Sequence, residues 1–154
     1  MRTITLFACL LLSVAPGLAG AQDAVQEGEA IELPRTPSPD GAMVYFLEPQ
    51  DGETVSSPFT VSFGLRGMGV APAGITFPDS GHHHLLVDVE EAPPEGLPLP
   101  TTDRILHYGG GQTETELELP PGEHTLQLVL GDPLHIPHDP PVRSEVITIT
   151  VEAP

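Results

Sequence analysis

The sequence predicts an all-β fold, a sandwich of about seven short strands, and three observations support this. From residue 43 onward, short apolar runs are separated by turns rich in proline and glycine. Several of these runs alternate apolar and polar residues with the two-residue period of a strand. No segment of this region carries apolar residues at helical spacing over a useful length.

The expected strands can be followed in order along the chain. In residues 59–65 the apolar side chains occupy alternate positions, and in residues 113–119 three glutamates share one face. Turns are expected at residues 49–52 and 120–122. The strands are residues 43–48, 59–65, 82–89, 113–119, 124–130 and 143–151, with residues 55–58 crossing between the first two. This pattern predicts an immunoglobulin-like β-sandwich over residues 42–152, whose loops would carry the function.

The N-terminal region has the features of a secretory signal peptide over residues 1–21. Arg2 precedes a mostly apolar run, and Ala19-Gly20-Ala21 forms a small-x-small cleavage pattern. The run is too short for a transmembrane helix, and no apolar stretch of about 18 residues follows it. Residues 22–41 are acidic and proline-rich, which predicts a disordered leader. We therefore expect a periplasmic or secreted protein whose mature chain does not insert into a membrane.

Composition excludes several classes of function. The single cysteine, Cys9, lies within the predicted signal, so the mature chain would have no disulfide, thiolate ligand or thiol nucleophile. The chain has 22 acidic and five basic residues. This balance argues against binding to nucleic acid or to anionic lipid, both of which need a basic surface. Solubility explains the bulk charge adequately, and a metal ion or a cationic partner fits its sign.

The chemically unusual feature is a set of seven histidines. They occur in Gly81-His82-His83-His84, in His107-Tyr108-Gly109-Gly110-Gly111, in His135-Ile136-Pro137-His138-Asp139, and singly at His124. A histidine in a turn often only hydrogen-bonds a backbone carbonyl, and we interpret His124, which begins a strand, in this way. Each of the other three segments would need its own structural explanation of this kind, so the set as a whole favours a metal-binding or ligand-binding site.

Strand geometry predicts which face each histidine of the first segment occupies. Because side chains alternate between faces, His82 and His84 share one face, while His83 points to the core side with Leu85 and Val87. Neutral imidazole is a good ligand for Zn(II), Cu(II) and Ni(II). The sequence therefore predicts a copper or zinc ion bound by His82 and His84, with His107, His135 and His138 completing the site. Asp139 is a further candidate ligand.

Two other functions remain open from the sequence. The first is a metal-free module that binds a protein or an envelope polymer, in which the histidines are dispersed and some are buried against backbone partners. The second is a hydrolytic metalloenzyme, in which an Asp or Glu near the metal activates bound water. Other catalysis has little support, because the chain has no Gly-x-Ser-x-Gly elbow and no lysine.

Five sequence phrases carry a resemblance to a known family. They are GLRGMGVAPAG at residues 64–74, GHHHLLVD at 81–88, HYGGGQTE at 107–114, PGEHTLQL at 121–128 and HIPHDPPV at 135–142. Together these phrases resemble a family of exported bacterial proteins catalogued only as a domain of unknown function. The resemblance spans residues 44–151, so it supports the domain limits and implies no activity. The histidine content is also loosely similar to small periplasmic copper carriers with an immunoglobulin-like fold.

Overall fold

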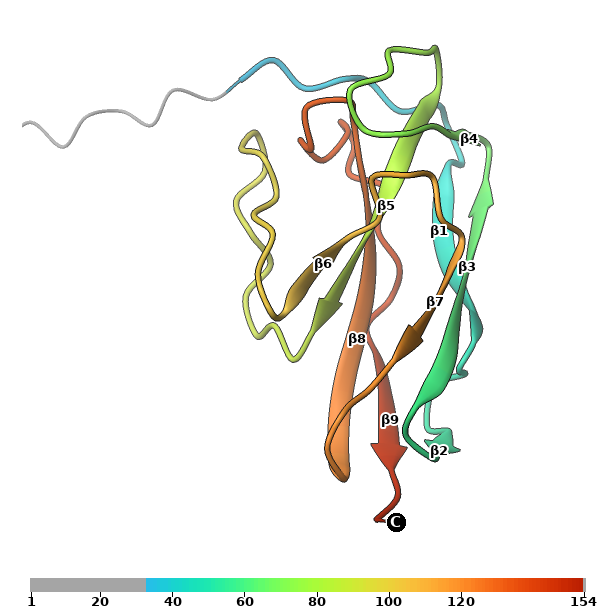
Figure 1. The fold of residues 1–154 in the computed structure, drawn as a ribbon. Helices are drawn as coiled ribbons and strands as arrows, with labels where there is room; N and C mark the ends of the chain where they lie inside the picture. Colours follow the sequence, from blue (N-terminus) through green and yellow to red (C-terminus); the bar gives the residue numbers. More distant parts are fainter. Residues whose placement is uncertain (1–32, 154) are drawn as a thin grey trace, which may run out of the picture. The chain divides into compact units, whose positions relative to one another are not determined.

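A computed structural model describes residues 33–153, and within that range the chain is all-β, with nine strands and no helix (Figure 1). The described residues therefore contain no helix long and apolar enough to span a membrane. The signal peptide predicted at residues 1–21 lies outside the described residues, as does most of the predicted leader. Both stay predictions.

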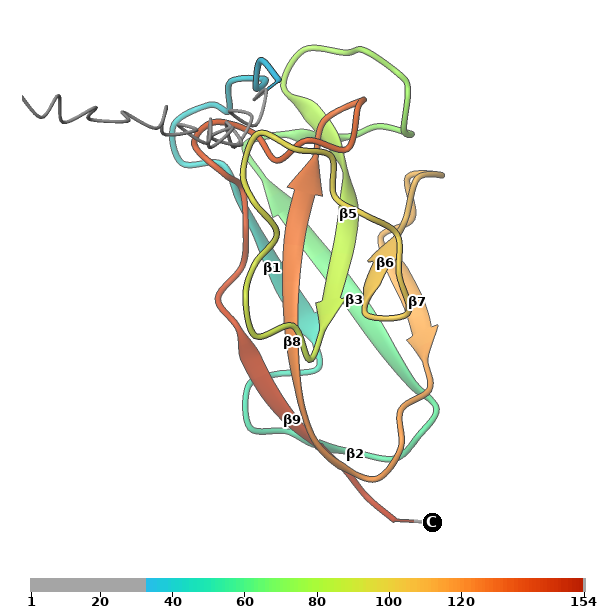
Figure 2. The same ribbon diagram turned by 90° about the vertical axis from the view of Figure 1, so that its left-hand side faces the viewer.

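The strands form two sheets, which lie as two layers in Figure 1 and one in front of the other in Figure 2. The smaller sheet has the order β1-β3-β7 and is antiparallel. Its strands are β1 (Met43–Glu48), β3 (Phe59–Arg66) and β7 (Glu114–Leu117). In β3, Phe59, Val61 and Phe63 are buried, as their alternation predicts.

The larger sheet has the order β2-β9-β8-β5-β4, and β6 also pairs with β5. Its strands are β2 (Thr54–Val55), β4 (Gly69–Val70), β5 (Ser80–Val87), β6 (Ile105–His107), β8 (Gly122–Gly131) and β9 (Ile147–Val151). Three of these strands, β2, β4 and β6, are only two or three residues long and were not expected from the sequence. The predicted all-β, sandwich-like fold is confirmed.

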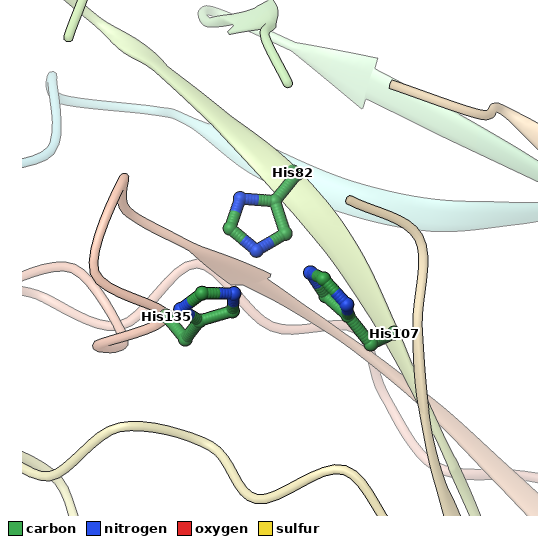
Figure 3. A group of neighbouring side chains, drawn as sticks. All are labelled: His82, His107 and His135. Carbon is green, nitrogen blue, oxygen red and sulfur yellow. The ribbon is translucent and has the colours of Figure 1, made fainter. Parts of the chain in front are cut away.

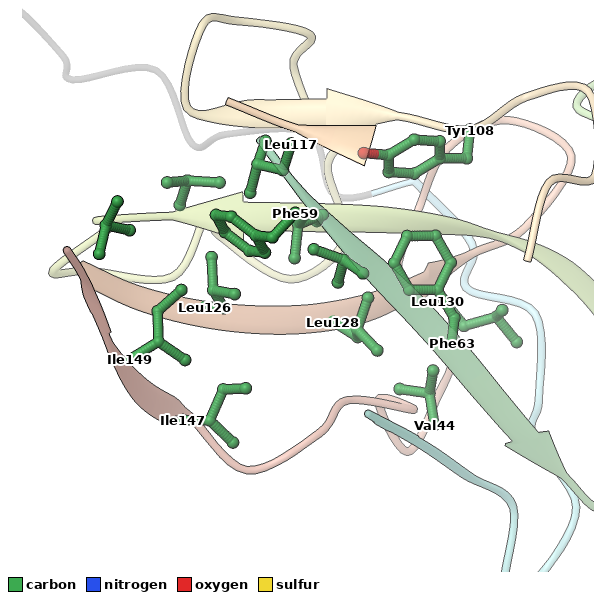
Figure 4. Close-up of a cluster of buried hydrophobic side chains, with 14 of the residues drawn as sticks. Val44, Phe59, Phe63, Tyr108, Leu117, Leu126, Leu128, Leu130, Ile147 and Ile149 are labelled. Carbon is green, nitrogen blue, oxygen red and sulfur yellow. The ribbon is translucent and has the colours of Figure 1, made fainter. Parts of the chain in front are cut away.

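The main core lies between the two sheets (Figure 4). Val44 and Phe63 enter it from the smaller sheet, and Leu128 and Ile149 from the larger one. Burying one such side chain contributes about 1.5–3 kcal/mol. These contacts hold the sandwich together and fix which face of β5 and β8 points inward.

Strand β5 is buried on both of its faces, since every one of its residues is buried. Leu85 and Val87 belong to the core between the sheets. Leu86 instead packs with Leu99 and Ile105 in a second, smaller cluster on the outer face. Since faces alternate along a strand, His82 and His84 share the outer face with Leu86.

The described part of the predicted leader, residues 33–41, contacts the connection between β8 and β9. Pro37 forms an isolated bridge with Asp139, and the Ser38 amide donates to the Asp139 carbonyl at 3.0 Å. The Arg35 Nε donates to the Pro137 carbonyl at 3.1 Å. This segment therefore supports the loop that carries the last of the histidine phrases, residues 135–139.

Candidate functional site

Three segments that are distant in sequence bring histidines together at one end of the larger sheet (Figure 3). His82 comes from β5, His107 ends β6, and His135 lies in the loop between β8 and β9. One ring nitrogen of each lies within 4.8 Å of the other two. Two nitrogens bound to one ion are at most about 4.2 Å apart, so small ring movements would bring all three to one metal.

A fourth ring, His84, lies against these three. Its centroid is 4.8 Å from that of His82, 5.2 Å from that of His107 and 5.9 Å from that of His135. His82 and His84 are fully buried, whereas His107 and His135 are partly exposed. We call these four residues the four-histidine cluster, and its exposed side is formed by His107 and His135.

The β5–β6 register explains how two of the segments meet. His84 pairs directly with His107 across the antiparallel strands. The chain then turns at Gly109, where a side chain would force the His107 ring to move, because a Cβ would lie 2.3 Å from His107 Cε1. The Gly109 carbonyl also accepts a hydrogen bond from the Ala73 amide at 2.9 Å. The absence of a side chain at Gly109 thus lets the loop at Ala73 approach the cluster closely.

His135 is placed by an unusual backbone conformation. Its φ is 69°, in the left-handed region that non-glycine residues seldom adopt. The Asp132 carboxylate stabilises this loop by accepting the amides of Leu134 at 2.8 Å and Ile136 at 3.0 Å. The His135 amide itself donates to the Asp132 carbonyl at 2.9 Å. The loop is therefore held in the shape that directs His135 toward β5.

The cluster contains buried nitrogens that have no hydrogen-bond partner among residues 33–153. They are His82 Nε2, His84 Nδ1, His84 Nε2 and His107 Nε2. Leaving a buried polar atom unsatisfied costs about 1–3 kcal/mol, so native proteins rarely retain several in one place. A metal ion at the centre of the cluster would bind one nitrogen of each ring and remove part of that cost.

The cluster is electrostatically suited to a cation. Burial, together with the neighbouring His135 and His107, lowers the pKa of His82 to about 4. Burial also lowers the pKa of His84 to about 3, with His82 and His107 adding to the effect. The pKa of His107 is lowered by burial and by His135. The rings of His82, His84 and His107 are thus neutral near pH 7, which is the form that binds metal.

The structure does not bring His138 and Asp139 into the cluster. The His138 ring is fully buried, with Nδ1 3.3 Å from the Leu130 carbonyl and Nε2 3.3 Å from the Ser80 carbonyl. The Asp139 side chain is 66% exposed and lies 3.5 Å from Arg35. Of the five histidines predicted as ligands, four converge and His138 contacts backbone instead.

The remaining two histidines have the roles that the sequence suggested. His83 points into the core, where its ring lies 5.1 Å from that of Phe63, and its Nδ1 is 3.2 Å from the Gln112 carbonyl. His124 Nδ1 lies 2.8 Å from Asp88 Oδ2, and its Nε2 is 2.9 Å from the Pro120 carbonyl. Burial opposes protonation of His124, but the Asp88 hydrogen bond outweighs it and raises the pKa.

Sequence reasoning missed Asp132, which is 2% exposed and whose carbonyl accepts the amide of His135, a member of the cluster. A signal was present, because Gly131-Asp132-Pro133 is a typical turn sequence in which the aspartate side chain binds the following amides. What the sequence did not reveal is that this turn sits beside the four rings.

Comparison with known proteins gives a family and no activity. No curated protein and no solved structure matches the chain. The sequence profile of one family, described as Domain of unknown function (DUF4399), matches residues 61–152. All four residues of the cluster lie within the matched region, and the family resemblance expected from the sequence is confirmed. The chain belongs to this DUF4399 family.

Proposed function

We propose that the protein is exported to the periplasm or secreted, and that it there binds a divalent transition-metal ion, copper or zinc, at the four-histidine cluster. The observation that carries this proposal is the meeting of four imidazole rings from three separate segments, with centroids 4.7–5.9 Å apart. The export step rests on the signal-like sequence of residues 1–21.

The donor set supports copper or zinc over harder cations. Imidazole nitrogens suit Zn(II) and Cu(II), whereas Mg(II) and Ca(II) prefer oxygen ligands. The excess of acidic residues also attracts cations to the molecule. Four protein ligands would complete a tetrahedral zinc site, while catalytic zinc sites keep one position for water. This favours a carrier, storage or structural role over hydrolysis.

The proposal can be tested on the untagged protein, expressed from the full chain in a bacterium and recovered from the periplasm. Mass spectrometry of the purified protein is expected to show cleavage before Gln22. After the protein is stripped with a chelator, calorimetry with Zn(II) and Cu(II) should show one-to-one binding, with Kd of about 1 μM or tighter. Protein retained with an intact N-terminus in the cytoplasm would contradict the export step.

The matched variants replace histidines inside and outside the cluster. The double variant His107→Gln/His135→Asn should lose the binding, because it removes both partly exposed ligands. Asparagine is chosen at position 135 because it tolerates positive φ. His124→Gln, outside the cluster, should bind as the wild type does. Wild-type binding no tighter than about 1 mM would refute the metal site. The histidines would then be interpreted as the scaffold of a module that binds a protein or an envelope polymer.

A further inference from the structure

A buried carboxylate lies beside the four-histidine cluster without a cationic partner among the described residues. Asp132 is 2% exposed, and no arginine within residues 33–153 forms an ion pair with it. Burying a charge is costly unless a hydrogen bond or an opposite charge compensates it. The position of this carboxylate therefore needs an explanation.

Hydrogen bonds compensate for the burial of the Asp132 carboxylate. Its Oδ1 accepts the amides of Leu134 and Ile136, and its Oδ2 accepts the Thr36 hydroxyl at 2.8 Å. All three donors are neutral, so the negative charge is solvated by the protein and not cancelled. A full negative charge therefore remains at the base of the loop that carries His135.

The turn that holds Asp132 adjoins the cluster. The Asp132 carbonyl accepts the His135 amide at 2.9 Å, and a Cβ on the preceding residue, Gly131, would lie 2.7 Å from His84 Cε1. A buried carboxylate in this turn attracts a cation that is bound by the neighbouring rings. Imidazole rings supply no negative charge, so Asp132 supplies the negative charge next to the site.

We propose that Asp132 makes the four-histidine cluster selective for divalent over monovalent metal ions, and this inference rests on the metal binding proposed above. A neutral imidazole ring can bind either Zn(II) or Ag(I) through the lone pair of one ring nitrogen. The Coulomb attraction between Asp132 and the ion scales with the ionic charge, so it contributes twice as much for Zn(II) as for Ag(I). Ag(I) is a redox-inert probe that carries the same charge as Cu(I).

The test compares Zn(II) and Ag(I) affinities of the full untagged protein and its Asp132→Asn variant. Asparagine keeps an acceptor oxygen for the Leu134 and Ile136 amides while it removes the charge. We expect Zn(II) affinity to fall roughly tenfold more than Ag(I) affinity. If the affinities for Zn(II) and Ag(I) fell by the same factor, Asp132 would only shape the loop, and the proposal would be overturned.

Two variants of Thr36 provide a control and a second test. Thr36→Val removes the hydroxyl but keeps the carboxylate, so the ratio of Zn(II) to Ag(I) affinity should not change. Thr36→Lys places a cation against Asp132 at an exposed position, and it should lower the ratio even if Asp132→Asn does not fold. An unchanged ratio in Thr36→Lys would overturn the proposal. A wild type that binds neither ion would refute the metal site itself, and this inference with it.

Discussion

His84 and His107 face each other directly across the antiparallel pair of β5 and β6, with ring centroids 5.2 Å apart. The strands of the larger sheet therefore place three of the four histidines in the cluster, and only His135 depends on a loop. A one-residue slip of β6 would turn His107 to the opposite face. The geometry of the site is for this reason coupled to the folding of the larger sheet.

The first prediction is that the cluster reduces the stability of the metal-free protein. Both ring nitrogens of His84 are buried and lack hydrogen-bond partners within residues 33–153. We expect His84→Leu to leave the free energy of unfolding unchanged or to raise it, because an apolar side chain removes the unsatisfied polar atoms. The same variant should weaken Zn(II) binding. Urea unfolding of the stripped protein, together with calorimetry, measures both effects.

His124→Leu is the matched control for this prediction. Both nitrogens of His124 have hydrogen-bond partners, so its replacement should lower the free energy of unfolding by about 1–3 kcal/mol while metal binding is retained. A large loss of stability in His84→Leu would show that the ring is a structural element in its own right.

The second prediction concerns the pH dependence of stability in the metal-free protein. The pKa values of His82 and His84 in the folded protein are about 4 and about 3, below the ordinary histidine value of 6.5. The unfolded chain therefore binds more protons once the pH falls below that value. Stability should be greatest above about pH 6.5 and should fall on acidification toward pH 4, by up to about 1.4 kcal/mol per pH unit for each histidine.

Urea unfolding at about pH 7 and about pH 5 measures this slope, and two variants separate its sources. His84→Leu removes one of the depressed groups and should make the slope shallower. His124 has a raised pKa, so its stabilising contribution to the free energy of unfolding is present at low pH and is lost as the pH rises through that pKa. His124→Gln should accordingly make the loss on acidification steeper. Wild-type stability that is constant over this range would contradict the prediction.

Much of the fold and part of the site could be predicted from the sequence, because they depend on local periodicity. The alternation in β5 correctly placed His83 in the core and His82 with His84 on the other face. The short strand β6 was not predicted, because three residues are too few to show a period. Its pairing with β5, which positions His107, is a tertiary contact.

The ligand set could be narrowed only by the structure. His135 and His138 are three residues apart in one loop, and no sequence pattern distinguishes the ligand from the structural residue. The left-handed conformation at His135 turns its ring toward the cluster, while His138 is directed at backbone carbonyls. That difference is set by Asp132 and by contacts with residues 33–41, and neither is visible as a periodic pattern.

The third prediction concerns the close contact between Gly109 and the His107 ring. A Cβ at Gly109 would lie 2.3 Å from Cε1 and 2.5 Å from Nε2 of His107, so Gly109→Ala should displace that ring. Because His107 is partly exposed, the ring can move without disrupting the core. We expect Zn(II) affinity to fall about tenfold or more, the range typical of residues that orient metal ligands, with little change in thermal stability.

Gly69→Ala is the control, because the nearest atoms to its added Cβ lie at 3.9 Å. It should leave both Zn(II) affinity and thermal stability close to those of the wild type. If Gly109→Ala bound Zn(II) as tightly as Gly69→Ala does, His107 would not be needed as a ligand.

The fourth prediction is that Arg35 stabilises the loop that carries His135. The Arg35 guanidinium donates to the backbone carbonyls of Pro137 and His138, and it forms an ion pair with Glu95 at 3.0 Å. Arg35→Ala should lower the free energy of unfolding by about 1–3 kcal/mol, since charge-assisted hydrogen bonds to a partly buried loop are lost. It should also speed hydrogen exchange at the amides that the loop protects, including those of Leu134 and Ile136.

Arg66→Ala provides the matched control, because Arg66 is exposed at the end of β3 on the smaller sheet. It should change the free energy of unfolding by no more than about 0.5 kcal/mol and leave loop exchange unaltered. Hydrogen exchange followed by mass spectrometry compares the two variants over residues 132–140. Equal exchange in both would show that residues 33–41 lie against the loop without stabilising it. Faster exchange in Arg35→Ala alone would place the functional start of the domain before residue 42, because the segment that holds His135 in position would then include Arg35.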